Sequence, residues 1–373
     1  MKRITEFFKS QMVLCIAFLC AAASAFIVPP DSEYIGYINF STLILLFSLM
    51  AAVAGFSRCG IFKLFSSALI SRCRNVRKLV FVMMIVCFFS SMLITNDVAL
   101  ITFVPVTLVI FQQSGVKNYR SLIMAVVIET AAANLGSMFL PTGNPQNIYL
   151  CSNYGMSPLS VVTTLLPYGI ISYLNLSLSV FMITDAKLEI VETNSAADKR
   201  IPFKTAVPCV IIFVISLFTV SGIVSEYICL SAAIVLVIIA DRRIFKEVDY
   251  ALLLTFVCFF VLSGNIGRIE TVREFLSEAV NGREIAVSVA ASQVISNVPA
   301  AVLLSTFTSE AKLLLVGTNI GGLGTPIASL ASVISYKLYL ASKDARGGRY
   351  MTMFLVYNFA FLALLCIFSA VIR

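Results

Sequence analysis

The sequence predicts an all-α polytopic membrane protein made of two inverted repeats, each with a re-entrant helical hairpin and a discontinuous transmembrane helix. Three observations lead to this fold class. The 373 residues are 59% hydrophobic and only 12% charged, with a mean hydropathy of +0.96, which is more apolar than a soluble core requires. A polar tip interrupts an apolar segment once in each half of the chain. A cluster of glycine and proline follows each tip.

The first polar tip, Thr95-Asn96-Asp97, lies between the apolar stretches 79–93 and 98–111. Each stretch is shorter than the ~20 residues that a spanning helix needs. We therefore expect a hairpin that enters the membrane and turns back. The second tip, Ser296-Asn297-Val298, repeats the design in the second half. A polar tip at that depth has to face protein or water rather than lipid.

The remaining apolar segments are expected to span the membrane, and two amphipathic segments, 57–78 and 266–283, to lie along its interface. The hairpins 79–113 and 284–309 are not expected to cross. Residues 1–30 resemble a signal peptide, but the multi-span pattern that follows favours an uncleaved first helix. The expected spans are 11–30, 37–56, 121–150, 157–183, 205–222, 226–240, 249–264, 311–340 and 350–372.

The distribution of lysine and arginine predicts the orientation. With a cytoplasmic N-terminus and two hairpins that do not cross, all but five of the 27 basic residues lie on the cytoplasmic side; the five are Arg268, Arg273, Arg283, Lys312 and Arg373. The positive-inside rule supports this arrangement, which places the C-terminus outside a plasma membrane. The net charge of +8 belongs to these loops and indicates no nucleic-acid partner.

The domain organisation follows from the same count. A first membrane repeat at 1–183 contains the hairpin 79–113 and the broken helix 121–150, and a second at 205–373 contains the hairpin 284–309 and the broken helix 311–340. A cytoplasmic linker at 184–204 joins them. The segments 45–65 and 253–275 have similar patterns and begin on opposite sides of the membrane. Inverted repeats with matched broken helices are the signature of a secondary transporter with its site at the repeat interface.

The two broken helices supply unwound backbone. The first break has the sequence NLGSMFLPTGNP at 134–145, and the second has GTNIGGLGTP at 317–326. Glycine and proline cost about 1 and 3 kcal/mol in a helix interior, so both segments should unravel. Unwound carbonyls and helix C-termini suit a cation, whereas helix N-termini suit an anion.

The expected binding site combines the polar residues of the tips and breaks. The tips should also cap the helices that follow, one from Val98 and one with Pro299 in its first turn. No catalytic residue is expected, and a bound Na⁺ would lie at Asp97, Asn96 and Asn134. The candidate ion- and substrate-binding residues are Thr95, Asn96, Asp97, Glu129, Asn134, Gly136, Ser137, Thr142, Gly143, Asn144, Ser296, Asn297, Thr318, Asn319, Gly321 and Thr325.

Only two of the nineteen acidic residues, Asp97 and Glu129, lie well inside apolar segments. A carboxylate costs several kcal/mol there unless it is paired, neutralised or bound to a cation. No lysine or arginine lies in the predicted core, so the expected counter-charge is Na⁺ or a proton. For Glu129 a protonated structural acid is an equal alternative, whereas the tip position of Asp97 favours function. An anion would be held by helix N-termini and by Asn, Ser and Thr, and a neutral acid such as arsenous acid would fit the same groups.

These segments resemble the ion transporter superfamily. The hairpin TNDVALITFVPVTLVI, the break NLGSMFLPTGNPQN, the tip ISNVPAAVLL and the break TNIGGLGTPIASLASVISYKLY are similar to the citrate-transporter-like permeases over about 37–372. Those permeases include arsenite permeases, dicarboxylate–sodium symporters and NhaD-type sodium/proton antiporters. The resemblance implies binding at each tip with its break, an elevator-like movement and, because related carriers are often dimers, a homodimer. Asp97 replaces a threonine of the symporters and Val298 a hydroxyl, so the tips look more like the arsenite branch.

The leading hypothesis is an ion-coupled (H⁺ or Na⁺) secondary active transporter of a small carboxylate- or arsenite-like anion, oxyanion or neutral acid, working by alternating access. The alternative is a sodium/proton antiporter that uses Asp97 and Glu129. An enzyme is not expected, because the chain has no histidine and no GxSxG. The ten cysteines form no CxxC pair and are expected to be packing residues. The substrate, the direction of transport and the coupling ion are left open.

Overall fold

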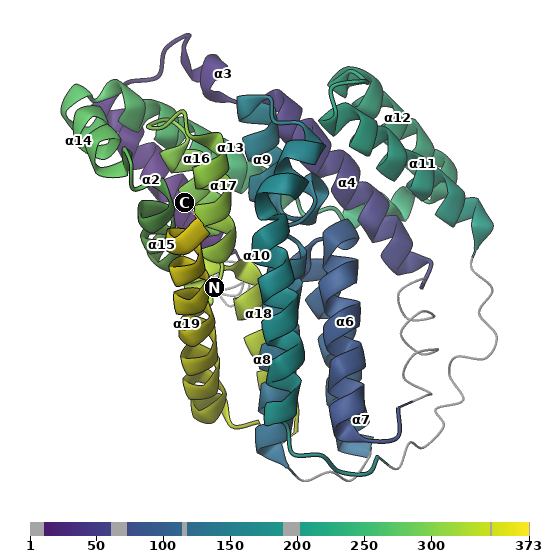
Figure 1. Ribbon diagram of the computed structural model, residues 1–373. Helices are drawn as coiled ribbons and strands as arrows, with labels where there is room; N and C mark the ends of the chain where they lie inside the picture. Colours follow the sequence, from purple (N-terminus) through teal and green to yellow (C-terminus); the bar gives the residue numbers. More distant parts are fainter. Residues whose placement is uncertain (1–10, 61–72, 114–117, 189–201, 344, 373) are drawn as a thin grey trace, which may run out of the picture.

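The structure is a computed structural model that describes residues 11–60, 73–113, 118–188, 202–343 and 345–372 (Figure 1). Within these ranges the elements are helical, apart from one isolated bridge between Asn75 and Lys187. Seven helices of the described part are long and apolar enough to span a membrane. They are α4 (Phe40–Arg58), α6 (Val76–Ile94), α7 (Asn96–Gln113), α10 (Pro158–Ser179, continued by η2, Val180–Met182), α11 (Phe203–Val220), α13 (Tyr250–Arg268) and α19 (Gly347–Ile372).

Shorter helices complete the fold. Helices lie in all nine expected spans, but only 37–56, 157–183, 205–222, 249–264 and 350–372 correspond to helices long enough to span, and the other two long helices, α6 and α7, were expected to form the hairpin that does not cross. The shorter helices are α2 (Met12–Ile27), α3 (Tyr34–Tyr37), α8 (Tyr119–Gly136), η1 (Pro141–Gly143), α9 (Pro145–Tyr154), α12 (Glu226–Ala240), η3 (Arg242–Lys246), α14 (Glu270–Val280), α15 (Glu284–Ile295), α16 (Asn297–Leu304), α17 (Ala311–Ile320), η4 (Pro326–Ala328) and α18 (Leu330–Leu340). Most of the interfacial segment 57–78 and of the linker 184–204 lies outside the described residues. The composition and these helices are those of an all-α polytopic membrane protein.

The arms of the first hairpin are longer than the sequence pattern predicted. Its arms α6 and α7 contain 19 and 18 residues, so each is long enough by itself to cross a membrane. The sequence pattern understated α6 because Val76 to Lys78, which include two basic residues, form its first turn. The arms of the second hairpin, α15 and α16, contain only 12 and 8 residues.

Helices α4 and α13 occupy matching places in the two halves. Both contain 19 residues and end in arginine, and an acceptor side chain, Asn39 or Asp249, caps the third backbone N–H of each. Each terminal arginine pairs with two carboxylates of the loop before the other helix. Arg58 pairs with Asp241 (2.9 Å) and Glu247, and Arg268 pairs with Asp31 (2.7 Å) and Glu33 (3.5 Å). The two contacts are therefore reciprocal.

The buried core has two parts. The larger cluster surrounds α6, α7, α8 and α18, where Leu79, Phe103 and Ile128 are fully buried. The smaller one joins α4 to α11 and α12 through small side chains such as Ala51 and Ala233. In Figure 1, α4, α11 and α12 accordingly lie apart from the bundle of α6, α8, α18 and α19.

Candidate ion and substrate site

Each hairpin turns at a single residue with an unusual backbone. Thr95 separates α6 from α7 with φ 68° and ψ 151°, and Ser296 separates α15 from α16 with φ 74° and ψ 155°. They are the only non-glycine residues with positive φ in the described part of the chain. This region of backbone space is almost restricted to glycine and costs about 1–3 kcal/mol. Such strain persists where the surroundings hold it, and it clusters at functional sites.

The expected caps do not form as predicted. Helix α7 begins at Asn96, two residues before Val98, so Asp97 lies inside its first turn rather than ahead of it. The side chain of Ser296 does not cap α16, and it donates instead to the carbonyl oxygen of Ala328 at 3.3 Å. At each tip a single residue with positive φ separates the two helices, so the second helix begins two residues after the first one ends and leaves no room for a longer capping segment.

Both broken helices are interrupted where expected. Helix α8 ends at Gly136, a short η1 follows and α9 begins at Pro145; α17 ends at Ile320, η4 follows and α18 begins at Leu330. The spacing from Asn134 to η1 and to α9 equals that from Asn319 to η4 and to α18. In Figure 1, α8 lies below α9, whereas α17 lies above α18, so the two interrupted helices run in opposite directions.

Asn134 joins the first tip to the second break. Its Oδ1 accepts from Asn96 Nδ2 and from Ser329 Oγ, both at 2.9 Å, and its Nδ2 donates to Ser332 Oγ at 3.4 Å. All four side chains are buried. The Asn134 amide thus connects α8 to α7, to the residue between η4 and α18, and to α18 itself.

Asn319 makes the corresponding contacts in the other direction. Its Nδ2 donates to Asn147 Oδ1 at 2.7 Å, and its Oδ1 accepts from Asn144 Nδ2 at 3.5 Å. Asn144 and Asn147 follow Asn134 at the same spacing at which the two serines follow Asn319. Contacts that are exchanged in this way, residue i with j and j with i, are those of a two-fold relation.

Glycine brings each hairpin close to its break. A Cβ on Gly136 would lie 2.0 Å from the carbonyl oxygen of Phe88 and 2.6 Å from Ser91 Oγ, and one on Gly321 would lie 2.8 Å from Ser292 Oγ. Ser91 and Ser292 occupy the same place in their hairpins, four residues before Thr95 and Ser296. A side chain at either glycine would push the hairpin away from the unwound backbone.

Gln293 on α15 satisfies the second break and was not predicted. Its Nε2 donates to the carbonyl oxygens of Gly321 (2.9 Å) and Leu323 (3.0 Å), and its Oε1 accepts from the N–H of Thr325 (2.8 Å). In the first half the donor is Asn147 instead, whose Nδ2 reaches the carbonyl oxygens of Met138 and Leu140 at 3.1 and 3.3 Å. Part of the unwound backbone is therefore satisfied by the protein itself.

Asp97 is half-buried in the first turn of α7, where the helix dipole favours a negative charge. Its Oδ1 is shielded from solvent and has no hydrogen-bond partner among the described residues. Its backbone N–H donates to Asn96 Oδ1 at 2.9 Å, so the first turn of α7 at Asp97 adjoins the Asn96–Asn134 bond. A buried oxygen of this kind is available to a cation or a proton.

Glu129 lies away from the tip. It is fully buried in α8, and Thr107 Oγ1 donates to its Oε1 at 2.6 Å, while Oε2 has no partner among the described residues. Thr107 follows Asp97 by ten residues on α7, a distance of about 15 Å along a helix. The structure therefore does not bring Glu129 and Asp97 together in one site.

The structure places the other predicted residues at or near the two breaks. Ser137 Oγ donates to the carbonyl oxygen of Asn134, Thr142 Oγ1 to that of Met92 and Thr325 Oγ1 to that of Gln293. Gly143 packs on Ser137, and Asn297 lies beside Gly322. Thr318 bonds only to carbonyls of its own helix. In the described part of the chain no three His, Cys, Asp or Glu side chains form a metal cluster.

Sequence reasoning missed Gln293, Asn147, Ser329 and Ser332. Superposing the two Asn-x-Gly motifs of the breaks would have found the last three, because both breaks place polar side chains ten and thirteen residues after the asparagine. Gln293 carried no such signal, since its counterpart in the first hairpin is Met92.

Comparisons with known proteins give consistent matches. The profile of the citrate transporter family (CitMHS) matches residues 4–312. The chain is 34% identical over 265 residues to "Uncharacterized transporter MJ0456" of Methanocaldococcus jannaschii, covering 70% of this chain and 71% of that protein. It is 26% identical over 304 residues to "Inner membrane protein YbiR" of Escherichia coli, covering 81% and 80%. It is 28% identical over 137 residues to "Putative transporter arsB" of Dictyostelium discoideum, covering 35% and 23%.

Proposed function

This chain belongs to the citrate transporter family, and from that premise we propose that it is an ion-coupled secondary active transporter of a small anion, an oxyanion or its neutral acid. Membership makes it a multi-pass membrane transporter of a small molecule and not an enzyme. The observation that carries the proposal is the reciprocal amide network between the two interrupted helices.

We further propose that the chain contains two inverted repeats, 1–183 and 205–373, with re-entrant hairpins 79–113 and 284–309. The opposite directions of the two interrupted helices in Figure 1 support this, as do the exchanged arginine contacts of α4 and α13. In transporters of this construction the site lies at the repeat interface, where half-helix ends meet. The network around Asn134 and Asn319 occupies that position.

Asp97, Asn96 and Asn134 are the proposed ligands of the coupling ion. Their oxygens are hard donors of the kind that Na⁺ prefers, and a carboxylate at membrane depth needs a cation or a proton. The substrate would lie between the two tips, within reach of Ser296, Asn297 and the helix N-termini. Alternating access would move the hairpins and breaks against α4, α11, α12 and α13, of which the first three form the separate group in Figure 1.

The orientation is part of the proposal: a plasma-membrane protein with a cytoplasmic N-terminus and an external C-terminus. The name of the Dictyostelium relative supports an arsenite-like substrate, and the family name supports a carboxylate. An antiporter that uses Asp97 and Glu129 as one exchange site is disfavoured, because about 15 Å of α7 separates Asp97 from the partner of Glu129.

The experiment is thermal unfolding in NaCl and in choline chloride, paired with uptake of citrate and arsenite into proteoliposomes under imposed Na⁺ or pH gradients. A ligand at one hundred times its Kd stabilises the folded state by about 2.7 kcal/mol, which shifts the midpoint. We expect Asp97→Asn to abolish any Na⁺ shift and to lower coupled uptake, whereas the exposed control Glu278→Gln changes neither. Uptake that ignores both gradients would refute ion coupling, and Na⁺-driven proton movement without either substrate would establish the antiporter.

A further inference from the structure

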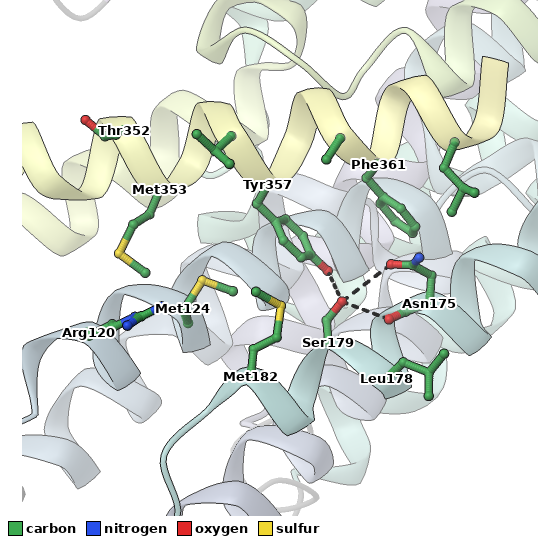
Figure 2. Close-up of a pocket in the computed structure, with 13 residues that line it drawn as sticks. Arg120, Met124, Asn175, Leu178, Ser179, Met182, Thr352, Met353, Tyr357 and Phe361 are labelled. Carbon is green, nitrogen blue, oxygen red and sulfur yellow. Dashed lines mark hydrogen bonds between the residues drawn. The ribbon is translucent and has the colours of Figure 1, made fainter. Parts of the chain in front are cut away.

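A groove of about 750 Å³ lies between α8, α10 and α19, outside the candidate transport site (Figure 2). Most of its wall is apolar and flexible, with Met124, Met182, Met353, Leu178 and Phe361 facing it. Methionine adapts its shape to irregular partners, which suits a ligand with a flexible chain.

The groove is about as deep as one membrane leaflet. On α19 its lining runs from Thr352 to Leu364, and the twelve helical rises between these two residues span about 18 Å. The hydrocarbon core of a bilayer is about 30 Å thick, so one leaflet contributes about half of that. Polar side chains inside the groove bond to one another: Tyr357 donates to Ser179 Oγ at 2.9 Å, and Ser179 Oγ to Asn175 O at 2.8 Å. Below its mouth the groove thus presents a largely apolar surface to its occupant.

Arg120 lines one end of the groove, and two more arginines lie close to it. The guanidinium carbons of Arg346 and Arg349 lie 3.9 and 4.8 Å from the ring centroid of Tyr119, the residue before Arg120, and Arg349 precedes the lining residue Thr352 by one helical turn. In the part of the chain that the structure describes, every ion pair involves Arg58 or Arg268, so none of these three has a carboxylate partner. Three cations held together without an acid attract an anion.

We propose that this groove is a binding site for one anionic phospholipid, with the phosphate on Arg120, Arg346 and Arg349 and an acyl chain along α19. Basic pockets between membrane helices on the cytoplasmic side bind anionic headgroups in this way. The expected occupant is both anionic and long-chained, because Arg120 lines the same groove as the leaflet-deep apolar wall and Arg346 and Arg349 lie beside that end.

The test is native mass spectrometry of the delipidated full-length protein with dioleoyl phosphatidylglycerol, dioleoyl phosphatidylcholine or glycerol 3-phosphate. We expect one phosphatidylglycerol to be retained, phosphatidylcholine to bind at least about tenfold more weakly, and glycerol 3-phosphate not to be retained. Equal retention of the two lipids would overturn the proposal. Retention of glycerol 3-phosphate would identify a soluble anion instead, and lipid-independent dimers lost with the variants below would identify a second copy of the chain.

Two variants separate the mouth from the wall. The triple change R120Q/R346Q/R349Q should weaken phosphatidylglycerol binding about fivefold for each arginine, and the exposed pair R242Q/R243Q serves as the surface-charge control. Ala360→Trp fills the wall while leaving all three arginines, and it should abolish retention. If phosphatidylglycerol binds the triple variant as it binds the wild type, the arginines do not form the site and the proposal fails. Because Arg120, Arg346 and Arg349 are exposed, R120Q/R346Q/R349Q should fold, and it tests the proposal even if Ala360→Trp does not fold.

Discussion

The tips at Thr95 and Ser296 have nearly the same backbone conformation, yet the residue after the tip asparagine is Asp97 in the first half and Val298 in the second. The broken helices differ in the same sense. Glu129 stands five residues before Asn134, and the matching place before Asn319 is Leu314. The acids at a tip and just before a break, Asp97 and Glu129, therefore belong to the first half, whereas the buried acid of the second hairpin, Glu284, lies at the start of α15, away from its tip.

The two halves thus share their framework of small and polar side chains but differ in where they carry acids. The paired asparagines, serines and glycines hold two similar frames against each other, and only the first frame carries an acid at its tip and another in the helix before its break. In the second frame the polar addition is Gln293, which bonds to the unwound backbone rather than leaving an oxygen free. This comparison supports the proposed coupling site in the first half, and it gives the second half an additional side-chain contact to its break through Gln293.

The largest effect is expected from making the first broken helix like the second. Glu129→Leu removes a buried carboxyl group whose Oε2 has no partner among the described residues, which favours folding, but it leaves the buried Thr107 hydroxyl without its acceptor. The two effects oppose each other, so the free energy of unfolding should change by less than about 2 kcal/mol. We expect this variant to lose proteoliposome uptake. Thr107→Val is the control: it leaves Glu129 in place without its donor and should cost about 1–3 kcal/mol. Wild-type uptake by Glu129→Leu would make Glu129 a structural acid.

The sequence predicted the hairpin tips and helix breaks well, but it did not predict where individual side chains point. The tips, the breaks and nearly all spanning segments were predictable, because polar and helix-breaking residues are costly inside an apolar run unless the helix turns or unwinds there. The position of Glu129 was not, because five residues of sequence do not show that its side chain points along α7 to Thr107 rather than toward Asn134. The backbone at Thr95 was also hidden, since threonine rarely adopts a positive φ and only the packed hairpin imposes it.

A smaller effect is expected from making the second hairpin like the first. Gln293→Met copies Met92 and leaves the carbonyl oxygens of Gly321 and Leu323 and the N–H of Thr325 without their side-chain partners. Because Gln293 is half-buried and water can reach part of the gap, we expect a loss of about 2 kcal/mol in the free energy of unfolding. Met92→Leu, which conserves volume, should cost less than about 1.5 kcal/mol. If the two variants unfold at the same temperature, Gln293 does not hold the second break.

The smallest effect is expected at the exchanged arginine contacts, and pH distinguishes them. The hydrogen bond from Arg268 is the main reason that the pKa of Asp31 is lowered, whereas the pKa of Asp241 is lowered chiefly by the backbone N–H of Arg243 and less by Arg58. A carboxyl with a lowered pKa stabilises the fold above its unfolded pKa of about 3.9, and this contribution disappears as pH falls through the folded value.

Arg268→Gln should therefore lower the unfolding midpoint slightly at neutral pH and converge with the wild type below about pH 4. Arg58→Gln should keep most of the acid dependence that Asp241 contributes, because Arg243 still donates to that carboxylate. Equal pH profiles for the two variants would show that the contacts, although exchanged between the halves, are electrostatically equivalent.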